Sequence, residues 1–384
     1  MDFELTDEQR ALRTTVREFA ESEVAPHAAA WDRDGTFPLD AVRKLGALGV
    51  MGLPFPEQYG GVGAGSLAMA LAIEELARVD SSVAITVAAS TSLAGWPLLQ
   101  FGTEEQKQRW LVPLARGEAL GAFASTEPGA GSDVQGIQTS ARDEGDAWVI
   151  DGTKAYITNA GTPISLLTIV MCATGTRPDG RREITNIVVP SGTLGFMPQA
   201  PYRKMGWHAS DTRELTFNEC RVPLANTLGE RGAGARQFLA TLDGGRVGVG
   251  ALSVGLAQGC LDHSVAWARQ RTAFGRPIAT YQAIAFQLAD LQVQVDAARA
   301  LVHGAARLRD AGKPHTREAA AAKLFASELA VQAANTAMQV HGGYGYMEDS
   351  PIPRFYRDAK ILTIGEGTSE ILRLVIARRM GLEV

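Results

Sequence analysis

The order of hydrophobic and polar positions divides the chain into three parts. Along the first part, apolar residues recur at helical spacing, and the run from Leu67 to Ala77 is apolar over most of its surface, which predicts a buried helix. Thr6 and Thr103 are each followed three residues later by a glutamine, as in the capping boxes that start helices. We therefore expect an N-terminal α-helical domain over residues 1–120.

Short β-type runs replace the helical pattern near residue 121. Residues 148–150 and 155–158 flank Asp151-Gly152, a dipeptide typical of hairpin turns. Pro178-Asp179-Gly180 predicts another turn. Further runs rich in Val, Ile and Thr cover residues 166–172, 184–189 and 214–217. This part is expected to be a compact middle β domain over residues 121–231, either a barrel or a sandwich.

Helical spacing returns after Gly232-Ala233-Gly234. The run from Val247 to Arg269 is apolar nearly all round, so it should lie inside a bundle; an Ala-rich helix and a last helix are expected at 319–340 and 371–380. Another helix should present one apolar face, formed by Phe286, Leu288, Leu291, Val293, Val295, Ala298, Leu301, Val302 and Ala305. The result is a C-terminal four-helix bundle over residues 232–384, and an α+β fold in the order α, β, α.

Composition narrows the possible functions. The chain has 384 residues, 46% of them hydrophobic, which suffices for two or three domains. Its net charge of −5 disfavours binding to a phosphate backbone. Three cysteines, Cys172, Cys220 and Cys260, are widely spaced without a CxxC pair, so we expect buried or free thiols in a reducing compartment, and neither disulfides nor zinc. The six histidines show no metal-ligand spacing.

No targeting signal is evident at the start of the chain. Met1 to Leu5 is acidic and lacks the basic start and apolar core of a signal peptide. No apolar run is expected to be long enough to cross a bilayer. We therefore expect a soluble, cytoplasmic protein without a membrane span.

The loop over residues 123–133, Phe-Ala-Ser-Thr-Glu-Pro-Gly-Ala-Gly-Ser-Asp, is the strongest candidate for a ligand site. Gly129 and Gly131 allow backbone conformations closed to other residues and bring N–H groups close to an anion or a flat polar ring. Ser125, Thr126 and Ser132 add hydroxyl groups. Tight surface turns use the same residue types, so a structural turn is the alternative.

A second segment decides between these alternatives. Residues 357–360 (Arg-Asp-Ala-Lys) and 365–370 (Gly-Glu-Gly-Thr-Ser-Glu), together with the loop at 123–133, closely resemble signatures of the acyl-CoA dehydrogenase family in the expected order. Matches at 156–159, 210–213, 271–275 and 339–343 extend the similarity over essentially the whole chain. The α, β, α order reached from the hydrophobic pattern agrees with the fold of that family.

The resemblance implies a reaction. In that family FAD lies between the β domain and the C-terminal bundle, a glutamate removes the α-proton of an acyl-CoA thioester, and the β-hydrogen leaves as hydride, giving a trans-2-enoyl-CoA. Glu366 matches the base; without the resemblance it would be a solvated residue in a Gly-rich turn. Relatives resembling isovaleryl-CoA dehydrogenase carry the base at another position, which is Gly245 in this chain. This chain therefore has no carboxylate at that alternative position, which supports Glu366.

The chain departs from the family beside the base. Many straight-chain members carry a tyrosine before the glutamate, and this chain has Gly365. The missing ring should reshape the acyl pocket. Trp96, near the far end of that pocket in relatives, either refills it or is ordinary core.

The resemblance also assigns cofactor contacts. Tyr156 replaces a common tryptophan and should lie against the isoalloxazine, with Thr158 near its reactive nitrogen. Arg271 belongs to a group of residues that, by the resemblance, should hold the FAD of a neighbouring subunit. Such sharing implies a homotetramer, a dimer of dimers. The alternative for Arg271 is a solvated charge at a helix end. The cofactor-binding residues implied are Phe123, Ser125, Thr126, Gly131, Ser132, Tyr156, Ile157, Thr158, Arg271, Phe274, Ile278, Tyr281, Gln282, Gln339, Val340, Gly342, Gly343, Thr368 and Glu370.

Substrate contacts are implied in the same way. They are Ser132, Ser210, Asp243, Arg246 and Gly367. Arg246 opens an otherwise apolar helix and needs a partner there; Asp243, three residues earlier, could make that pair purely structural. Arg357 and Asp358 are expected to pair with each other and brace the bundle, without a chemical role.

The leading hypothesis is an acyl-CoA dehydrogenase of fatty-acid β-oxidation type that passes electrons to an electron-transferring flavoprotein. An oxygen-using acyl-CoA oxidase or flavin hydroxylase of the same fold is the alternative. A third possibility, a flavin-bearing DNA-binding relative, conflicts with the net charge of −5. Short straight-chain, branched, aromatic and carrier-protein-tethered acyl groups all remain open.

Overall fold

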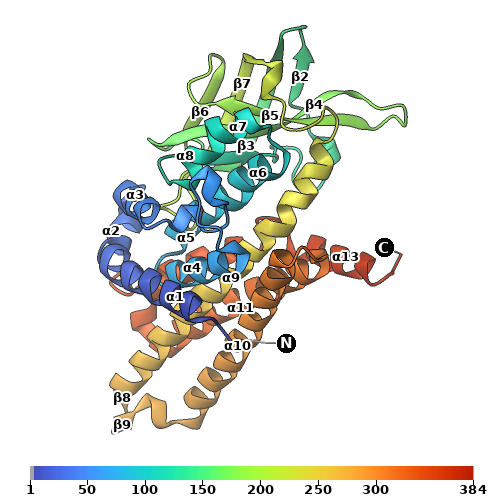
Figure 1. Cartoon of the computed structure of the whole chain (residues 1–384). Coiled ribbons are helices and arrows are strands. Elements are labelled where there is room, and N and C mark those ends of the chain that lie inside the picture. The colour runs from blue at the N-terminus through green and yellow to red at the C-terminus, as the bar shows by residue number, and fades with distance from the viewer. Residues whose placement is uncertain (1–3, 384) are drawn as a thin grey trace.

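The computed structural model describes residues 4–383 and has three layers of structure in chain order (Figure 1). Helices of the N-terminal third pack beside a curled β sheet, and long helices of the C-terminal third run away from that sheet. This is the expected α, β, α order. The fold-class prediction is confirmed.

The N-terminal part begins with both expected capping boxes. Thr6 accepts a hydrogen bond from the backbone N–H of Gln9, and Thr103 does so from Gln106. The helix containing the run 67–77 is buried along nearly its whole length. Its helices are α1 (Asp7–Phe19), α2 (Ala25–Asp34), α3 (Leu39–Ala47), α4 (Gly65–Ala77), α5 (Ser81–Ala88), α6 (Trp96–Phe101), α7 (Glu104–Gln106) and α8 (Val112–Ala115), with π-helical turns η1 (Ala20–Val24), η4 (Ala89–Gly95) and η5 (Lys107–Leu111).

The middle part is a single seven-stranded sheet. Its order is β1-β4-β2-β3-β7-β6, with β5 paired to β4. Strands β1 and β4 are parallel, whereas β3 and β7 form the longest antiparallel pair. The strands are β1 (Leu120–Ala124), β2 (Ser140–Asp143), β3 (Ala147–Thr158), β4 (Ser165–Thr176), β5 (Arg182–Pro190), β6 (Phe196–Pro201) and β7 (Thr212–Pro223).

The hairpin expected at Asp151-Gly152 is wrong. Residues 147–158 form one strand, β3, and the pairing register with β7 shifts between Ile150 and Gly152. Gly152 has φ of 144° and lies so close to Thr139 that a Cβ would be 2.6 Å from its backbone. The dipeptide therefore forms a bulge, because strands on both sides hold the chain extended beyond it. The turn at residues 178–180 does connect β4 and β5.

The C-terminal part contains α9 (Gly234–Gln270), α10 (Gln282–Asp310), α11 (Thr316–His341), α12 (Ile352–Ala359) and α13 (Ser369–Arg379), with an arm of β8 (Thr272–Ala273) and β9 (Arg276–Pro277) between α9 and α10. Helix α9 lies inside, as expected. The expected single apolar face of α10 is partly wrong: Phe286, Val293 and Leu301 are 60%, 68% and 43% exposed. These three residues point away from the core that the rest of the face enters.

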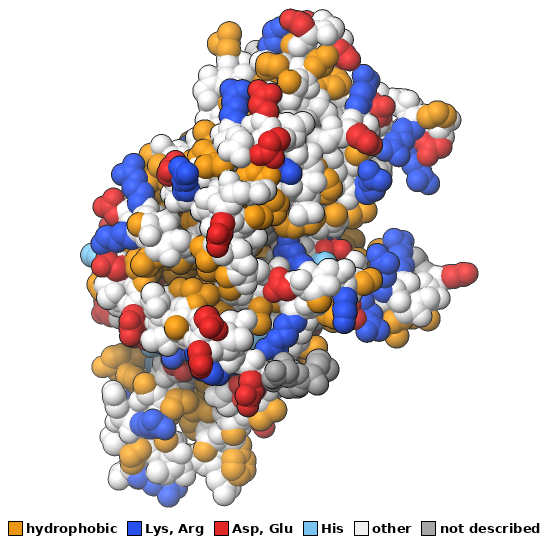
Figure 2. All heavy atoms as spheres, viewed as in Figure 1, with side chains coloured by type: hydrophobic (Ala, Val, Ile, Leu, Met, Phe, Trp, Pro, Cys, Tyr) orange, Lys and Arg blue, Asp and Glu red, His pale blue; other side chains and the backbone are white. Residues whose placement is uncertain are grey.

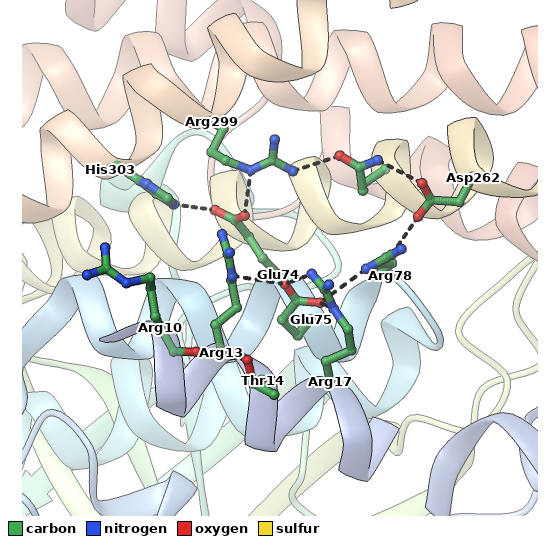
Figure 3. Close-up of polar contacts among 11 residues, drawn as sticks. Arg10, Arg13, Thr14, Arg17, Glu74, Glu75, Arg78, Asp262, Arg299 and His303 are labelled. Atoms are coloured by element: carbon green, nitrogen blue, oxygen red, sulfur yellow. Dashed lines mark hydrogen bonds and ion pairs between the residues drawn. The ribbon is translucent and has the colours of Figure 1, made fainter. Parts of the chain in front are cut away.

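A buried ionic network joins the first helices to the bundle (Figure 3). Glu75 accepts two hydrogen bonds from Arg17, at 2.8 and 2.6 Å. Glu74 accepts one from Arg299 at 3.1 Å and lies 2.7 Å from Nε2 of His303. Both glutamates are only 5% exposed, so their charges depend on these partners. The network lines a polar cavity of about 280 Å³, to which none of the residues expected to bind FAD or substrate belongs.

Arg357 and Asp358 do brace the molecule, but not by pairing with each other. Arg357 pairs with Asp32 at the end of α2. Asp358, which is buried, accepts hydrogen bonds from Oγ of Ser81 and the backbone N–H of Trp207, both at 2.6 Å. Successive side chains on a helix point in different directions, so each of the two reaches a different neighbour.

Within residues 4–383 one helical segment, Ser81–Phe101, is long and apolar enough to span a membrane by length and composition. The expectation that no run has this length is therefore wrong. However, 78% of the apolar window is buried inside the molecule. The segment packs in the interior between the N-terminal helices and α9, as a core helix does.

Candidate active site

Glu366 lies in a short, tightly bent loop between the 3₁₀ turn at Lys360–Thr363 and α13. Its φ of 53° and the φ of 100° at Gly367 are left-handed values. A non-glycine residue in this region is uncommon and marks a position worth examining for function. Thr368 closes the loop as N-cap of α13, accepting the N–H of Ile371 at 3.3 Å.

The carboxylate of Glu366 points inward. Its Oε2 is buried and has no hydrogen-bond partner among the described residues. Burial raises the pKa of Glu366 to about 7, while Lys323 and Arg246 act in the opposite direction. A carboxyl group that titrates near neutrality and has an unoccupied oxygen is suited to accept a proton.

Lys323 of α11 bonds to the backbone of this loop. Its side chain is fully buried on α11, and its Nζ donates a hydrogen bond to the carbonyl oxygen of Gly367 at 2.7 Å. Burial lowers the pKa of Lys323 to about 8, and Glu366 opposes that shift. Sequence reasoning missed this residue; the available signal was a lone lysine in the Ala-rich run of residues 319–322 and 326–334.

Arg246 approaches the loop from α9. Its side chain is 4% exposed and pairs with Asp243 at 2.9 Å, the expected i−3 partner. Asp243 also accepts the hydroxyl hydrogen of Thr316 at 2.6 Å, while Nε of Arg246 has no hydrogen-bond partner within residues 4–383. Three expected substrate contacts, Asp243, Arg246 and Gly367, thus lie together near Glu366. The other two, Ser132 and Ser210, lie in loops of the middle part, and the buried Oγ of Ser210 has no partner among the described residues.

The loop after β1 is braced from inside by an ion pair that the sequence did not reveal. Glu127 accepts from Nζ of Lys154 at 2.8 Å and from the N–H groups of Gln138 and Thr139. Lys154 is fully buried and also donates to the carbonyl oxygen of Ser125. The pair holds the backbone of residues 125–127 in place while Gly131 and Ser132 stay exposed.

Two details of this loop differ from expectation. Gly129 and Gly131 do not have positive φ, so they supply no special backbone conformation here. A Cβ on either residue would meet no atom within 4 Å, which leaves the loop open on that side. The ring of Phe123 does not face this opening, because it stacks on Phe238 with centroids 5.7 Å apart.

The end of β3 presents the residues expected near the flavin ring. Tyr156 has φ of 61°, is 65% exposed, and lies 5.4 Å from the ring of Tyr202. The register with β7 shifts between Lys154 and Ile157, and this bulge turns Tyr156 outward. Ile157 is buried and Thr158 is partly buried.

Five of the remaining expected cofactor residues lie around a hollow of about 500 Å³ near the other end of α9. Arg271, Ile278, Val340, Gly342 and Gly343 all line it. Beside it lies the arm: Phe274 is 96% exposed, and Oη of Tyr281 donates to the carbonyl oxygen of Ala273 at 2.9 Å. Gln282 and Gln339 are exposed nearby on α10 and α11, whereas Thr368 and Glu370 begin α13.

One chain does not bring the two sets of cofactor residues together. Figure 1 shows β8 and β9 at one end of the molecule and the sheet with the 123–133 loop at the other. Each end offers only part of a site for a large, flat, phosphate-bearing group. The sheet end has an open loop with N–H groups and hydroxyls, and the arm end has a hollow lined by Arg271. Among residues 4–383 no group of three His, Cys, Asp or Glu residues is placed to hold a metal ion.

Comparison with known proteins gives the same division of the chain. Residues 6–118 match the family model of the acyl-CoA dehydrogenase N-terminal domain, 122–220 that of the middle domain, and 232–381 that of the C-terminal domain. The chain belongs to the acyl-CoA dehydrogenase family. It is an FAD-dependent acyl-CoA dehydrogenase.

Individual relatives cover the whole enzyme. It is 51% identical to the probable acyl-CoA dehydrogenase YngJ of Bacillus subtilis, over 99% of this chain and 100% of the relative. It is 44% identical to a short-chain specific acyl-CoA dehydrogenase of Clostridium acetobutylicum over the same shares. Its fold matches the butyryl-CoA dehydrogenase of Megasphaera elsdenii with a TM-score of 0.96 at 42% identity, covering 99% of this chain and 100% of the other.

Two further structures bear on the cofactor and the redox partner. A glutaryl-CoA dehydrogenase from Mycobacterium smegmatis, solved in complex with FADH2, matches this acyl-CoA dehydrogenase with a TM-score of 0.92 at 29% identity, over 98% of this chain and 95% of the other. A chain from work on the electron transferring flavoprotein of Acidaminococcus fermentans matches it with a TM-score of 0.95 at 41% identity, over 99% of both chains.

Proposed function

We propose that Glu366 is the base that removes the α-proton of the acyl-CoA thioester. The observation that carries this proposal is the buried, unpartnered Oε2 of a carboxyl group whose pKa is raised to about 7. The α-proton of a thioester is weakly acidic, so a positioned carboxylate with a raised pKa is a better base than a solvated one. Arg246 and Lys323 keep enough positive charge nearby for Glu366 to ionise. FAD, when bound, supplies the acceptor for the hydride.

The substrate is a short acyl-CoA. Relatives at 44% and 42% identity over nearly the full chain act, by their names, on short-chain acyl-CoA and on butyryl-CoA. Here Gly365 leaves open space beside the base, since a Cβ would meet only the carbonyl oxygen of Ile361, at 3.7 Å. Substrate contacts come from Asp243, Arg246 and Gly367, with Ser132 and Ser210 on the middle domain.

The active enzyme is a homotetramer in which each FAD site is shared between chains. The two sets of cofactor residues lie at opposite ends of one chain (Figure 1), so a second copy supplies the Arg271 set. Apolar side chains are exposed at the lower end of the molecule (Figure 2). Phe274 on the arm and Phe286 on α10 are both largely exposed. Val293 and Leu301 continue this surface along α10, and burying it between copies is favourable. Sedimentation velocity on the FAD-loaded enzyme measures the number of chains in the assembly. The FAD content of purified Arg271→Ala tests whether the Arg271 set holds the cofactor.

Electrons leave to an electron-transferring flavoprotein, and the enzyme serves fatty-acid β-oxidation in the cytoplasm. The structural match to a chain from work on such a flavoprotein supports the partner. The three cysteines are free and buried, which suits a reducing compartment.

A panel of acyl-CoA thioesters mixed anaerobically with the FAD-loaded enzyme tests the reaction. Bleaching of the flavin by short acyl-CoA, followed by reoxidation on adding the electron-transferring flavoprotein, is the expected result. In air, turnover accounted for entirely by peroxide would identify an oxidase instead. No bleaching by any acyl-CoA or carrier-tethered acyl group would refute the proposed function.

A further inference from the structure

A small cavity lies close to the base, between the N-terminal helices and the bundle. Its volume is about 30 Å³, and its lining includes Met69 and Ile73 of α4, Trp96 of α6, and Gly244 of α9. Ser92, which also lines it, precedes Leu93 in the chain, and Gly244 precedes Gly245. Glu366 and Leu93 both border the position that a Cβ on Gly245 would take, so Leu93 and Gly245 lie between the carboxylate and the residues that line the cavity.

Arg309 of α10 closes this cavity against Trp96. Its guanidinium carbon lies 5.2 Å from the centre of the Trp96 ring. The same guanidinium lies against α9, where a Cβ on Gly244 would be 2.5 Å from Nη1. Trp96 is itself held edge-to-face by Phe101, with ring centroids 5.8 Å apart. A larger residue at 244 would require the guanidinium of Arg309 to move, so Gly244 lets it lie where it does.

The guanidinium of Arg309 packs against the Trp96 ring and α9. Its guanidinium makes no hydrogen bond or ion pair with any residue between 4 and 383. Asp310 bonds instead to the N–H groups of Ser66 and Leu67 at 2.6 and 3.0 Å, and Asp243 is taken by Arg246 and Thr316. Burial lowers the pKa of Arg309, with Asp310 and Asp243 opposing. A cation placed over a tryptophan face is attracted to it, which holds the pair together without a carboxylate.

We propose that Trp96 and Arg309 form the end wall of the acyl pocket and restrict this enzyme to short acyl thioesters. The inference rests on the proposed function and names the residues that set its chain length. An acyl chain with its α-carbon at Glu366 extends past Leu93 into the cavity, which has room for only about two water molecules. Each further methylene must displace the indole or the guanidinium.

The test compares butyryl-CoA with octanoyl-CoA in anaerobic flavin reduction by the FAD-loaded enzyme. Wild type should prefer butyryl-CoA by at least about 100-fold in kcat/KM, since single misfitting methylenes already cost about tenfold or more. Arg309→Ala and Trp96→Ala should each raise the octanoyl-to-butyryl ratio at least about tenfold. Arg317→Ala, an exposed arginine paired with Glu318 at the start of α11, is the control and should keep the wild-type ratio.

Each outcome has a defined meaning. The visible FAD spectrum and the melting temperature show whether a variant is folded, and if Trp96→Ala loses FAD, Arg309→Ala alone decides. A wild-type enzyme that reduces its flavin equally fast with both thioesters overturns the end wall while the proposed function stands. An octanoyl-to-butyryl ratio that is unchanged in a folded Arg309→Ala variant also refutes the proposed end wall and leaves the proposed function standing. No bleaching by any acyl-CoA overturns the function and the wall together.

Discussion

The carboxylate of Glu366 occupies the place where a side chain at position 245 would begin. A Cβ built on Gly245 would lie 2.0 Å from Oε2 of Glu366, closer than any real contact. A side chain at position 245 would therefore require the Glu366 carboxylate to leave its present place. Because residue 245 is glycine, the carboxylate of Glu366 has room at this place.

Gly245→Ala should disable catalysis without unfolding the enzyme. The new methyl group must push the carboxylate away, and a displacement of about 1 Å can cost about 100-fold in rate. Stopped-flow reduction of the flavin by butyryl-CoA measures this loss. Gly304→Ala on α10, where a Cβ would meet nothing within 4 Å, is the matched control and should retain the wild-type rate.

Lys323 should set the pH at which the base works. Glu366 accepts a proton only when ionised, so flavin reduction should rise with pH through about 7. Lys323→Met removes a buried positive charge that lowers the pKa of Glu366, so the rise should move to higher pH. Lys313→Met, in the exposed α10–α11 loop, serves as control. A pH profile of kcat/KM that is the same in Lys323→Met and wild type would contradict this role.

The base should also lower the stability of the enzyme. A carboxyl group with a pKa of about 7 in the folded state and 4.5 in the unfolded chain holds its proton more tightly when folded. Its ionisation then favours unfolding as pH rises from about 4.5 to about 7, by about 3 kcal/mol in total. Glu366→Gln should be more stable than wild type at pH 8 by up to this amount. Chemical denaturation of both proteins at pH 4 and pH 8 measures this difference in the free energy of unfolding. A difference that is the same at both pH values would argue against the raised pKa of Glu366.

The buried network around Glu74 should contribute to stability, not to catalysis. Glu74→Ala leaves the buried His303 without its carboxylate partner and Arg299 with only Asp296 and Gln258, and breaking a buried pair costs about 3–5 kcal/mol. We expect the thermal midpoint to fall by about 4–6 °C. Asp296→Ala removes an exposed partner of the same Arg299 and should change the midpoint little.

Features governed by neighbouring residues could be predicted from the sequence. The capping boxes at Thr6 and Thr103 were correct, because a cap involves only one turn of helix. Family resemblance singles out Glu366 and Gly367, whereas their left-handed backbone is visible only in the structure. At Asp151-Gly152 the local turn signal was misleading, since pairing of β3 with β7 on both sides of the dipeptide outweighs it.

Features formed by distant segments could not be predicted. Arg309 meets Trp96 across more than two hundred positions, and nothing near either residue signals the contact. The same holds for Lys323, which bonds to the Gly367 carbonyl, and for Lys154, which pairs with Glu127 in the loop after β1. Each is a buried charge whose partner lies elsewhere in the chain, so only the folded structure reveals it.

Rapid-mixing reduction of FAD-loaded Glu366→Gln by butyryl-CoA under anaerobic conditions is the most direct test of the account. The amide has nearly the same shape but cannot accept the α-proton, so the variant should bind FAD and acyl-CoA yet reduce its flavin at least about a thousandfold more slowly than wild type. A variant that keeps its FAD and bleaches at a rate close to wild type would show that another group is the base.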